Sequence, residues 1–80
     1  MVRAKFKVES YETRLDGKNP PEELRSIKLT AVFGTSEENK TFFRYTPNGT
    51  ISIGMLNPET WKEFPLGAEV YVDFIAAKTE

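Results

Sequence analysis

The stretch of sequence that decides the expected fold is Thr41-Phe42-Phe43-Arg44-Tyr45-Thr46-Pro47-Asn48-Gly49-Thr50-Ile51-Ser52-Ile53-Gly54-Met55-Leu56. It predicts two strands, at 41–46 and 50–55, joined by a tight turn. Asn48 and Gly49 favour a type I′ turn, because both central residues of that turn have positive φ. Such a turn would fix the register of the two strands, and the register decides which side chains face the core.

Three further segments alternate apolar and polar residues, which is typical of half-buried strands. They are residues 2–11, 24–33 and 69–76. In the first of them, the apolar residues that share a face are Val2, Ala4, Phe6 and Val8. Residues 16–23 contain a turn pair, two prolines and charges but no apolar side chain, so they predict a loop between the first two strands.

One short helix is expected, at 57–64. Asn57 is a favourable N-cap, Pro58 suits the first helical position, and Glu59 places an acid in the first turn. About two turns of helix are unstable alone, so Trp61 and Phe64 should pack on the sheet.

Five strands and one helix within 80 residues predict a single all-β domain, covering residues 1–80. The expected architecture is a small five-stranded antiparallel barrel or roll, because an open sheet of this size would leave a bare face and two edges. The helix precedes the last strand, whereas oligonucleotide-binding (OB) barrels carry it between the third and fourth strands. We therefore favour an SH3-like barrel over an OB-like one.

Composition restricts the function classes. The net charge is −1, so no general field attracts phosphate backbones or anionic lipid. The chain has no cysteine, which excludes disulfides and thiolate chemistry and fits a reducing compartment. The amino terminus alternates charged and apolar residues instead of forming a hydrophobic segment, so we expect neither a signal peptide nor a membrane contact.

Catalysis is the least favoured class. The chain has no histidine, no cysteine and no glycine-rich phosphate loop. The carboxylate pairs at 22–23 and 37–38 lie in polar segments, where adjacent acids are usually solvated. We expect no catalytic residue, no metal site and no cofactor.

The candidate binding site lies on the predicted strand at 41–46. Adjacent residues of a strand face opposite sides, so Phe42 and Phe43 cannot both be buried, although the sequence does not show which one is exposed. If Phe43 faces outward, it shares a face with Tyr45. The predicted site also contains the neighbouring basic residues, and its full set is Phe43, Arg44, Tyr45, Lys40, Lys5 and Lys7.

An aromatic patch beside positive charge suits two kinds of partner. It resembles the centre of a protein interface, where Tyr, Phe and Arg are enriched. It can also stack the bases of a single nucleic acid strand. We favour the protein interface, because a chain of net charge −1 lacks the positive charge that phosphate contacts require.

The order of these pieces resembles a group of short, uncharacterised proteins of tailed bacteriophages. The resemblance spans nearly the whole chain and rests on turns, caps and core strand positions. The segments that carry it are Lys28-Leu29-Thr30-Ala31-Val32-Phe33-Gly34, Glu38-Asn39-Lys40, Thr46-Pro47-Asn48-Gly49, Asn57-Pro58, Phe64-Pro65-Leu66-Gly67 and Tyr71-Val72-Asp73-Phe74. None of these motifs carries a catalytic residue.

The resemblance implies a protein made in the cytoplasm of an infected bacterium, acting there or in the virion. We expect a non-enzymatic accessory module that binds a protein partner, with self-association into a homo-oligomer. The alternatives are a binder of single-stranded DNA or small oligonucleotides, in replication or against a host defence signal, and a capsid or tail accessory protein.

Overall fold

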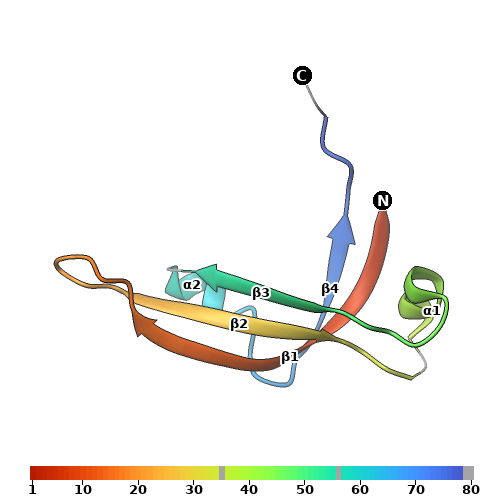
Figure 1. The fold of residues 1–80 in the computed structure, drawn as a ribbon, viewed down its shortest axis with the longest axis horizontal. Coiled ribbons are helices and arrows are strands. Elements are labelled where there is room, and N and C mark those ends of the chain that lie inside the picture. Colours follow the sequence, from red (N-terminus) through yellow and green to blue (C-terminus); the bar gives the residue numbers. More distant parts are fainter. Residues whose placement is uncertain (35, 56, 79–80) are drawn as a thin grey trace.

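Four strands and two short helices make up the computed structural model, which describes residues 1–34, 36–55 and 57–78 (Figure 1). In chain order they are β1 (Val2–Leu15), β2 (Glu23–Ala31), α1 (Glu37–Phe43), β3 (Thr50–Met55), α2 (Pro58–Trp61) and β4 (Glu69–Phe74). The strands form one sheet in the order β3-β2-β1-β4, and all neighbours are antiparallel. The predicted β-rich class is confirmed.

β1 is the longest strand because it has different neighbours along its two halves. Residues 2–7 pair with β4, and residues 6–15 pair with β2, with a bulge between Val8 and Ser10. Figure 1 shows that β1 curves, so that its first half and β4 turn away from the long hairpin of β1 and β2. A bulge increases local twist and bends a strand, which accounts for part of this curvature.

The loop between β1 and β2 lies where the sequence predicts it. The carboxylate of Asp16 accepts hydrogen bonds from the N–H groups of Lys18 (2.9 Å) and Glu22 (3.1 Å). Gly17 follows with φ of +81°, a conformation that glycine adopts without strain. This Asx-type turn closes the hairpin.

The core lies on one face of the sheet and follows the predicted alternation. Its fully buried apolar residues come from the central strands and are Ala4, Phe6, Val8, Ile27, Leu29 and Ala31. Partly buried residues from the edges and helices pack against them, including Phe43, Met55, Phe64, Val70 and Val72. The core is therefore narrow, and among the described residues the fully buried apolar side chains all belong to β1 and β2.

The predicted strand at 41–46 is wrong, because residues 37–43 form the helix α1. Ser36 is its N-cap, and its hydroxyl accepts a hydrogen bond from the Asn39 N–H (3.3 Å). Glu37 and Glu38 supply negative charge in the first turn. The helix ends at Arg44, which has φ of +65° and whose N–H donates to the Lys40 carbonyl (3.0 Å).

The predicted type I′ turn at Asn48-Gly49 is also wrong. Among the described residues, positive φ occurs at Gly17, Gly34, Gly67 and Arg44, and not at this pair. The Gly49 carbonyl instead accepts a hydrogen bond from the Ala31 N–H (3.1 Å), which leads the chain into β3 beside β2. A type I′ turn would join two strands, and only one of them exists here: β3 follows the Asn48-Gly49 pair, whereas the segment before it forms α1.

The predicted five-stranded barrel is wrong as well. The described residues form four strands in an open sheet, and β3 and β4 are its two edges. Residues 37–43 form α1, so the segment expected to supply the fifth strand of the barrel does not join the sheet.

The second helix is confirmed but shorter than predicted. The Asn57 side chain caps α2 by accepting a hydrogen bond from the Glu59 N–H (3.0 Å). Trp61 Nε1–H donates to the Met55 carbonyl (3.0 Å), which ties α2 to the end of β3. Phe64 packs on the core, as the sequence predicts.

Candidate functional site

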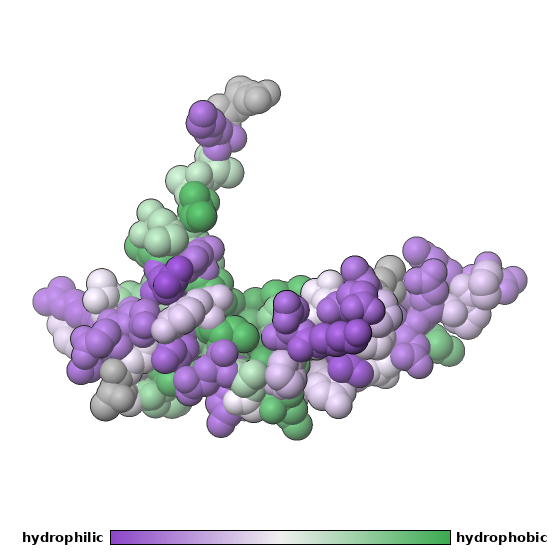
Figure 2. Space-filling model, turned by 180° about the vertical axis from the view of Figure 1, so that it is seen from behind, coloured by the Kyte–Doolittle hydropathy of each residue, from purple (hydrophilic) through white to green (hydrophobic). Residues whose placement is uncertain are grey.

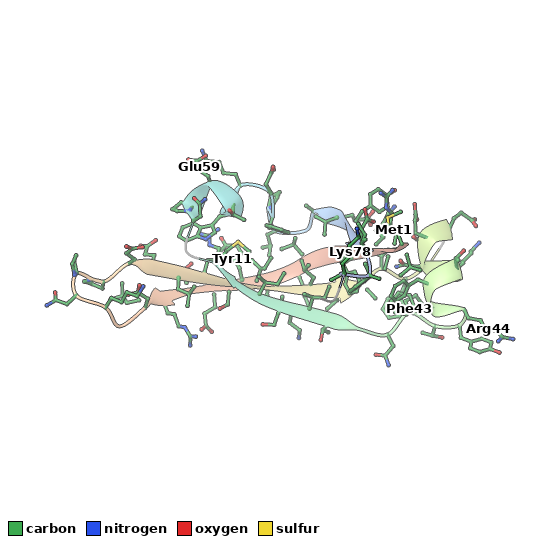
Figure 3. All side chains as sticks on the ribbon, turned by 90° about the horizontal axis from the view of Figure 1, so that it is seen from above. Met1, Tyr11, Phe43, Arg44, Glu59 and Lys78 are labelled. Atoms are coloured by element: carbon green, nitrogen blue, oxygen red, sulfur yellow. The ribbon has the colours of Figure 1, made fainter. Side chains whose placement is uncertain are left out.

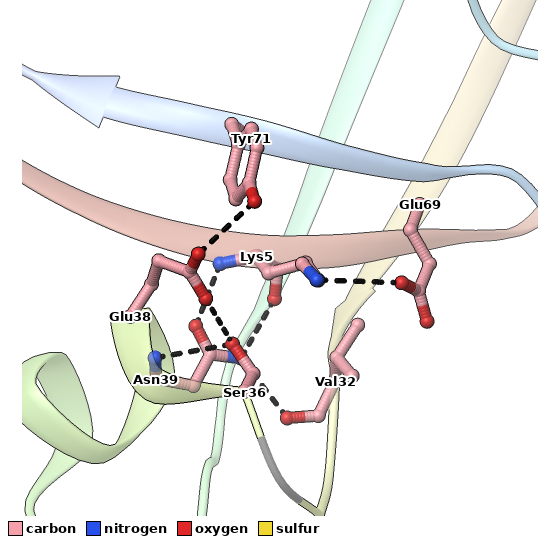
Figure 4. A network of polar contacts seen from close by, with 7 residues as sticks. All are labelled: Lys5, Val32, Ser36, Glu38, Asn39, Glu69 and Tyr71. Carbon is pink, nitrogen blue, oxygen red and sulfur yellow. Dashed lines mark hydrogen bonds and ion pairs between the residues drawn. The ribbon is translucent and has the colours of Figure 1, made fainter.

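Asn39 joins α1 to the sheet at the place where β2 ends. Its side chain is 2% exposed and uses its amide to continue the ladder of backbone hydrogen bonds (Figure 4). Asn39 Oδ1 accepts from the Lys5 N–H (2.6 Å), and Asn39 Nδ2 donates to the carbonyls of Lys5 (2.8 Å) and Val32 (2.9 Å). One side chain thus bonds three backbone groups, of which the Lys5 carbonyl also accepts the Val32 N–H (3.1 Å).

A second set of polar contacts surrounds this anchor (Figure 4). The Glu38 carboxylate accepts hydrogen bonds from the Ser36 hydroxyl (2.7 Å) and from the Tyr71 hydroxyl of β4 (3.0 Å). Lys5 Nζ lies 3.6 Å from a carboxylate oxygen of Glu69. The Tyr71 hydrogen bond connects α1 to β4, and the ion pair between Lys5 and Glu69 connects β1 to β4.

Arg3 and Asp73 form the ion pair with the best geometry in this region. Arg3 Nε and an Arg3 terminal nitrogen donate to the two carboxylate oxygens of Asp73, at 2.6 and 3.0 Å. The same guanidinium lies 4.8 Å from the centroid of the Tyr71 ring, within the range of a cation–π contact. The hydrogen bond from Arg3 lowers the pKa of the Asp73 carboxyl.

The Ser36 hydroxyl is the main cause that lowers the pKa of Glu38 from 4.5 to about 2, with smaller contributions from the Glu38 backbone N–H and the Tyr71 hydroxyl. These donors stabilise the ionised carboxylate in the folded chain and are lost on unfolding. A group with a depressed pKa stabilises the fold at a pH above its unfolded pKa. The contribution disappears as the pH falls from about 4.5 to about 2.

We therefore expect a Glu38→Gln variant to show a weaker loss of stability than the wild type between pH 5 and pH 2, since the amide does not titrate. Urea unfolding at a series of pH values measures this. Glu37→Gln is the matched control, because Glu37 lies in the same turn and points to solvent. Equal pH dependence in Glu38→Gln and the wild type would contradict the expectation.

The structure separates the residues of the predicted site. Phe43 packs against the core, whereas Tyr45 is 76% exposed, so the two do not share an outer face. Figure 3 shows Arg44 extending outward at the end of α1. Its guanidinium lies 5.2 Å from the centroid of the Tyr45 ring. Arg44 and Tyr45 are thus the predicted pair that the structure brings together.

The predicted basic residues take different positions. Lys40 lies on the exposed side of α1 and pairs with Glu37 (3.4 Å). Lys5 is half-buried beside Glu69, and Lys7 is exposed further along β1. They do not form a common basic face with Tyr45.

An exposed apolar surface lies at this end of the molecule, and the sequence did not indicate it. We call it the end patch, and its residues are Met1, Val2, Phe42, Phe74 and Ile75. Val2 and Phe74 are cross-strand partners, and the Phe42 and Phe74 ring centroids are 5.7 Å apart. Figure 2 shows apolar surface on the projecting C-terminal segment and at its base.

An apolar groove of about 600 Å³ continues from the end patch between the two edge strands. Ile51 and Ile53 of β3 line one side, and residues 70–74 of β4 line the other. Phe64 and Glu63 lie at the end nearest α2, and Leu29 lines the groove from β2. Together the groove and the end patch are the candidate binding surface.

Sequence reasoning missed Asn39, the end patch and the groove. The sequence does contain a signal for Asn39. Ser36 followed by two acids is typical of a helix start, and such a start places the short amide of Asn39 within reach of the preceding strand. The other two features depend on the sheet being open, which the alternation of residues does not reveal.

Comparisons of the chain with models of protein families, with curated proteins and with solved structures find no match. In the described part of the chain, neither helix has the length and apolar character needed to span a membrane. No group of three or more acidic residues among residues 1–34, 36–55 and 57–78 is placed to hold a metal ion.

Proposed function

We propose that the protein is a non-enzymatic binding module that acts through protein–protein contacts and associates with itself. The observation that carries the proposal is the surface area of the single chain. It exposes 6182 Å², whereas a compact monomer of 9.1 kDa exposes about 4,900 Å². The excess, about 1,300 Å², exceeds the roughly 800 Å² that each partner buries in a standard interface.

The shape of the chain supports the same proposal. Its radius of gyration is 15.0 Å, compared with about 12 Å for a compact domain of this length. The excess surface includes the end patch, whose exposed residues are aromatic and aliphatic. Monomeric proteins rarely leave such residues in one contiguous area, and larger patches usually mark contact sites.

The nucleic acid alternative receives less support. Lys5 and Lys40 each lie beside a carboxylate, which reduces the positive charge that they offer to phosphates. Of the six residues of the predicted site, only Arg44 and Tyr45 form an exposed stacking pair. One such pair supplies little of the affinity that a single-strand groove gains from several aromatic and basic residues.

The proposal predicts a particle of at least twice 9.1 kDa for the purified wild-type protein. Size-exclusion chromatography with light scattering over a range of concentrations measures it. Val2→Asp places a charge in the end patch and should shift the mass toward the monomer, because a desolvated unpaired charge opposes association.

Leu66→Asp is the matched control for Val2→Asp. Leu66 is also exposed and apolar, but it lies outside the end patch, so the variant should keep the wild-type mass. A wild type that stays monomeric at every concentration would overturn self-association, and equal behaviour of the two variants would remove the end patch from the contact.

A further inference from the structure

The outer edge of β4 presents backbone groups that have no strand partner in the described chain. Residues of an antiparallel strand direct their N–H and C=O groups alternately to the two sides. Val8, an even-numbered residue of β1, exchanges hydrogen bonds with Gly67 and Ala68, which lead into β4. Even-numbered residues of β1 pair with even-numbered residues of β4. The backbone N–H and C=O groups of the even-numbered β4 residues therefore point toward β1. Tyr71 and Asp73 therefore direct their backbone groups to the free edge.

The segment after β4 extends this edge. Residues 75–78, which we call the arm, have the sequence Ile-Ala-Ala-Lys and project away from the rest of the chain (Figure 1). Ile75 is 72% exposed. Because 75 is odd, the N–H of Ile75 lies on the free edge in the same series as Tyr71 and Asp73.

The groove runs along this edge. Its wall on the β4 side consists of five consecutive residues, 70–74, so it follows the backbone as well as one face of the strand. Its other wall is apolar. Glu63 lines one end and has no ion-pair partner among the described residues, while the arm carries one cation, Lys78.

The opposite edge of the sheet is less suited to strand pairing. β3 ends at Met55, whose carbonyl already accepts the Trp61 Nε1–H. The chain then enters α2 after two residues, so β3 has no extension like the arm. β4 with its arm offers ten residues, 69–78, in one direction.

We propose that two copies of this chain pair antiparallel through the free edges of β4, about a two-fold axis near Phe74. The arm of each copy lies along β4 of the other copy and enters its groove. This inference rests on the proposed self-association and names the surface that mediates it. The recognised partner is a second copy of the same chain.

The two-fold axis determines which residues face each other across the pair. With Phe74 opposite its own counterpart, Tyr71 lies opposite Ala77 and Val72 lies opposite Ala76 of the second copy. Small alanine side chains suit a groove already lined by Ile51, Ile53 and Phe64. Lys78 of each arm comes to the end of the groove that holds Glu63, so the charges are complementary.

Proline substitution in the arm tests the backbone pairing. Ile75→Pro removes an N–H at the free edge, and it lies outside β4, so pairing within the chain is retained. We expect it to raise the dimer dissociation constant at least tenfold. Ala76→Pro is the matched control, because the N–H of residue 76 points away from the free edge, and it should change that constant less than threefold.

Disulfide trapping tests the register independently. The natural chain has no cysteine, so any cross-link comes from introduced residues. Opposite residues of an antiparallel pair have Cα atoms about 5.5 Å apart, which a disulfide can span. Mixing Tyr71→Cys with Ala77→Cys should give a heterodimeric disulfide under mild oxidation, whereas Tyr45→Cys with Ala77→Cys should not.

The outcomes separate the two proposals. A wild-type dimer that keeps its affinity in Ile75→Pro and yields no Tyr71→Cys to Ala77→Cys cross-link overturns the β4 pairing and leaves self-association standing. A wild type that remains monomeric by light scattering overturns self-association and the pairing with it. A weakened Ile75→Pro dimer together with the cross-link supports both.

Discussion

Replacing Asn39 with alanine is expected to lower the free energy of unfolding by about 3 kcal/mol. The substitution leaves the Lys5 N–H and the carbonyls of Lys5 and Val32 without the partners that the amide provides. These hydrogen bonds are partly buried, so the Lys5 N–H and the Val32 carbonyl retain a desolvation cost, while the Lys5 carbonyl still accepts the Val32 N–H. Urea unfolding followed by circular dichroism measures the change.

Two further variants make the Asn39 experiment specific. Lys40→Ala changes the next residue of the same helix on its exposed side and should cost less than about 0.5 kcal/mol. Asn39→Asp retains an acceptor for the Lys5 N–H but turns a carboxylate oxygen toward two carbonyls, so it should not restore stability. A loss in Asn39→Ala no larger than in Lys40→Ala would show that the amide does not anchor α1.

Replacing Phe43 with alanine is expected to cost about 3 kcal/mol, and replacing Phe42 about 1 kcal/mol. Phe43 packs against the core near Phe6 and Gly49, whereas Phe42 is more exposed and rests mainly on Phe43 and Phe74. Truncation of Phe43 therefore leaves the larger gap beside the core, because Phe43 is the more buried ring. The same urea unfolding series compares the two variants.

The contrast between Phe42 and Phe43 also tests the secondary structure at 37–43. In a helix, neighbouring residues are about 100° apart, so both rings can contact the sheet on adjoining sides. In a strand, the two rings would face opposite sides, so truncating the outward-facing one would hardly change the free energy of unfolding. A Phe42→Ala variant less stable than Phe43→Ala would contradict the packing of α1.

Most of the sheet was predictable because burial on one face imposes period two. Ala4, Phe6 and Val8 of β1, and Ile27 and Leu29 of β2, follow that alternation without interruption. Asn57 and Pro58 likewise gave the start of α2, since an N-cap and an N1 proline act through local geometry. These signals depend on neighbouring residues only.

The segment 37–49 was mispredicted because two local signals compete there. Thr41, Phe42, Phe43 and Tyr45 favour a strand by propensity, whereas Ser36 and two acids favour a helix start before them. The helix prevails because it places Asn39 against the sheet, a contact 34 residues away in sequence from Lys5. No local pattern contains that information.

The predicted binding site was misplaced for the same reason, because it assumed a strand at 41–46. A strand at 41–46 would have placed Phe43 and Tyr45 on one face and would have supplied a fifth strand for a closed barrel. With α1 in its place the sheet stays open, and the exposed apolar surface moves to residues at the two ends of the chain, among them Val2 and Phe74. Residues far apart in sequence form such a surface only through the register of β1 and β4.

β1 is the only described strand that pairs with both β2 and β4. Loss of hydrogen bonds at one end of the sheet can therefore affect the other end only through β1. A loosening of the hairpin loop and a loosening near the arm each weaken hydrogen bonds of the same fourteen residues. We therefore expect the described sheet to melt as one cooperative unit from the loop to the arm.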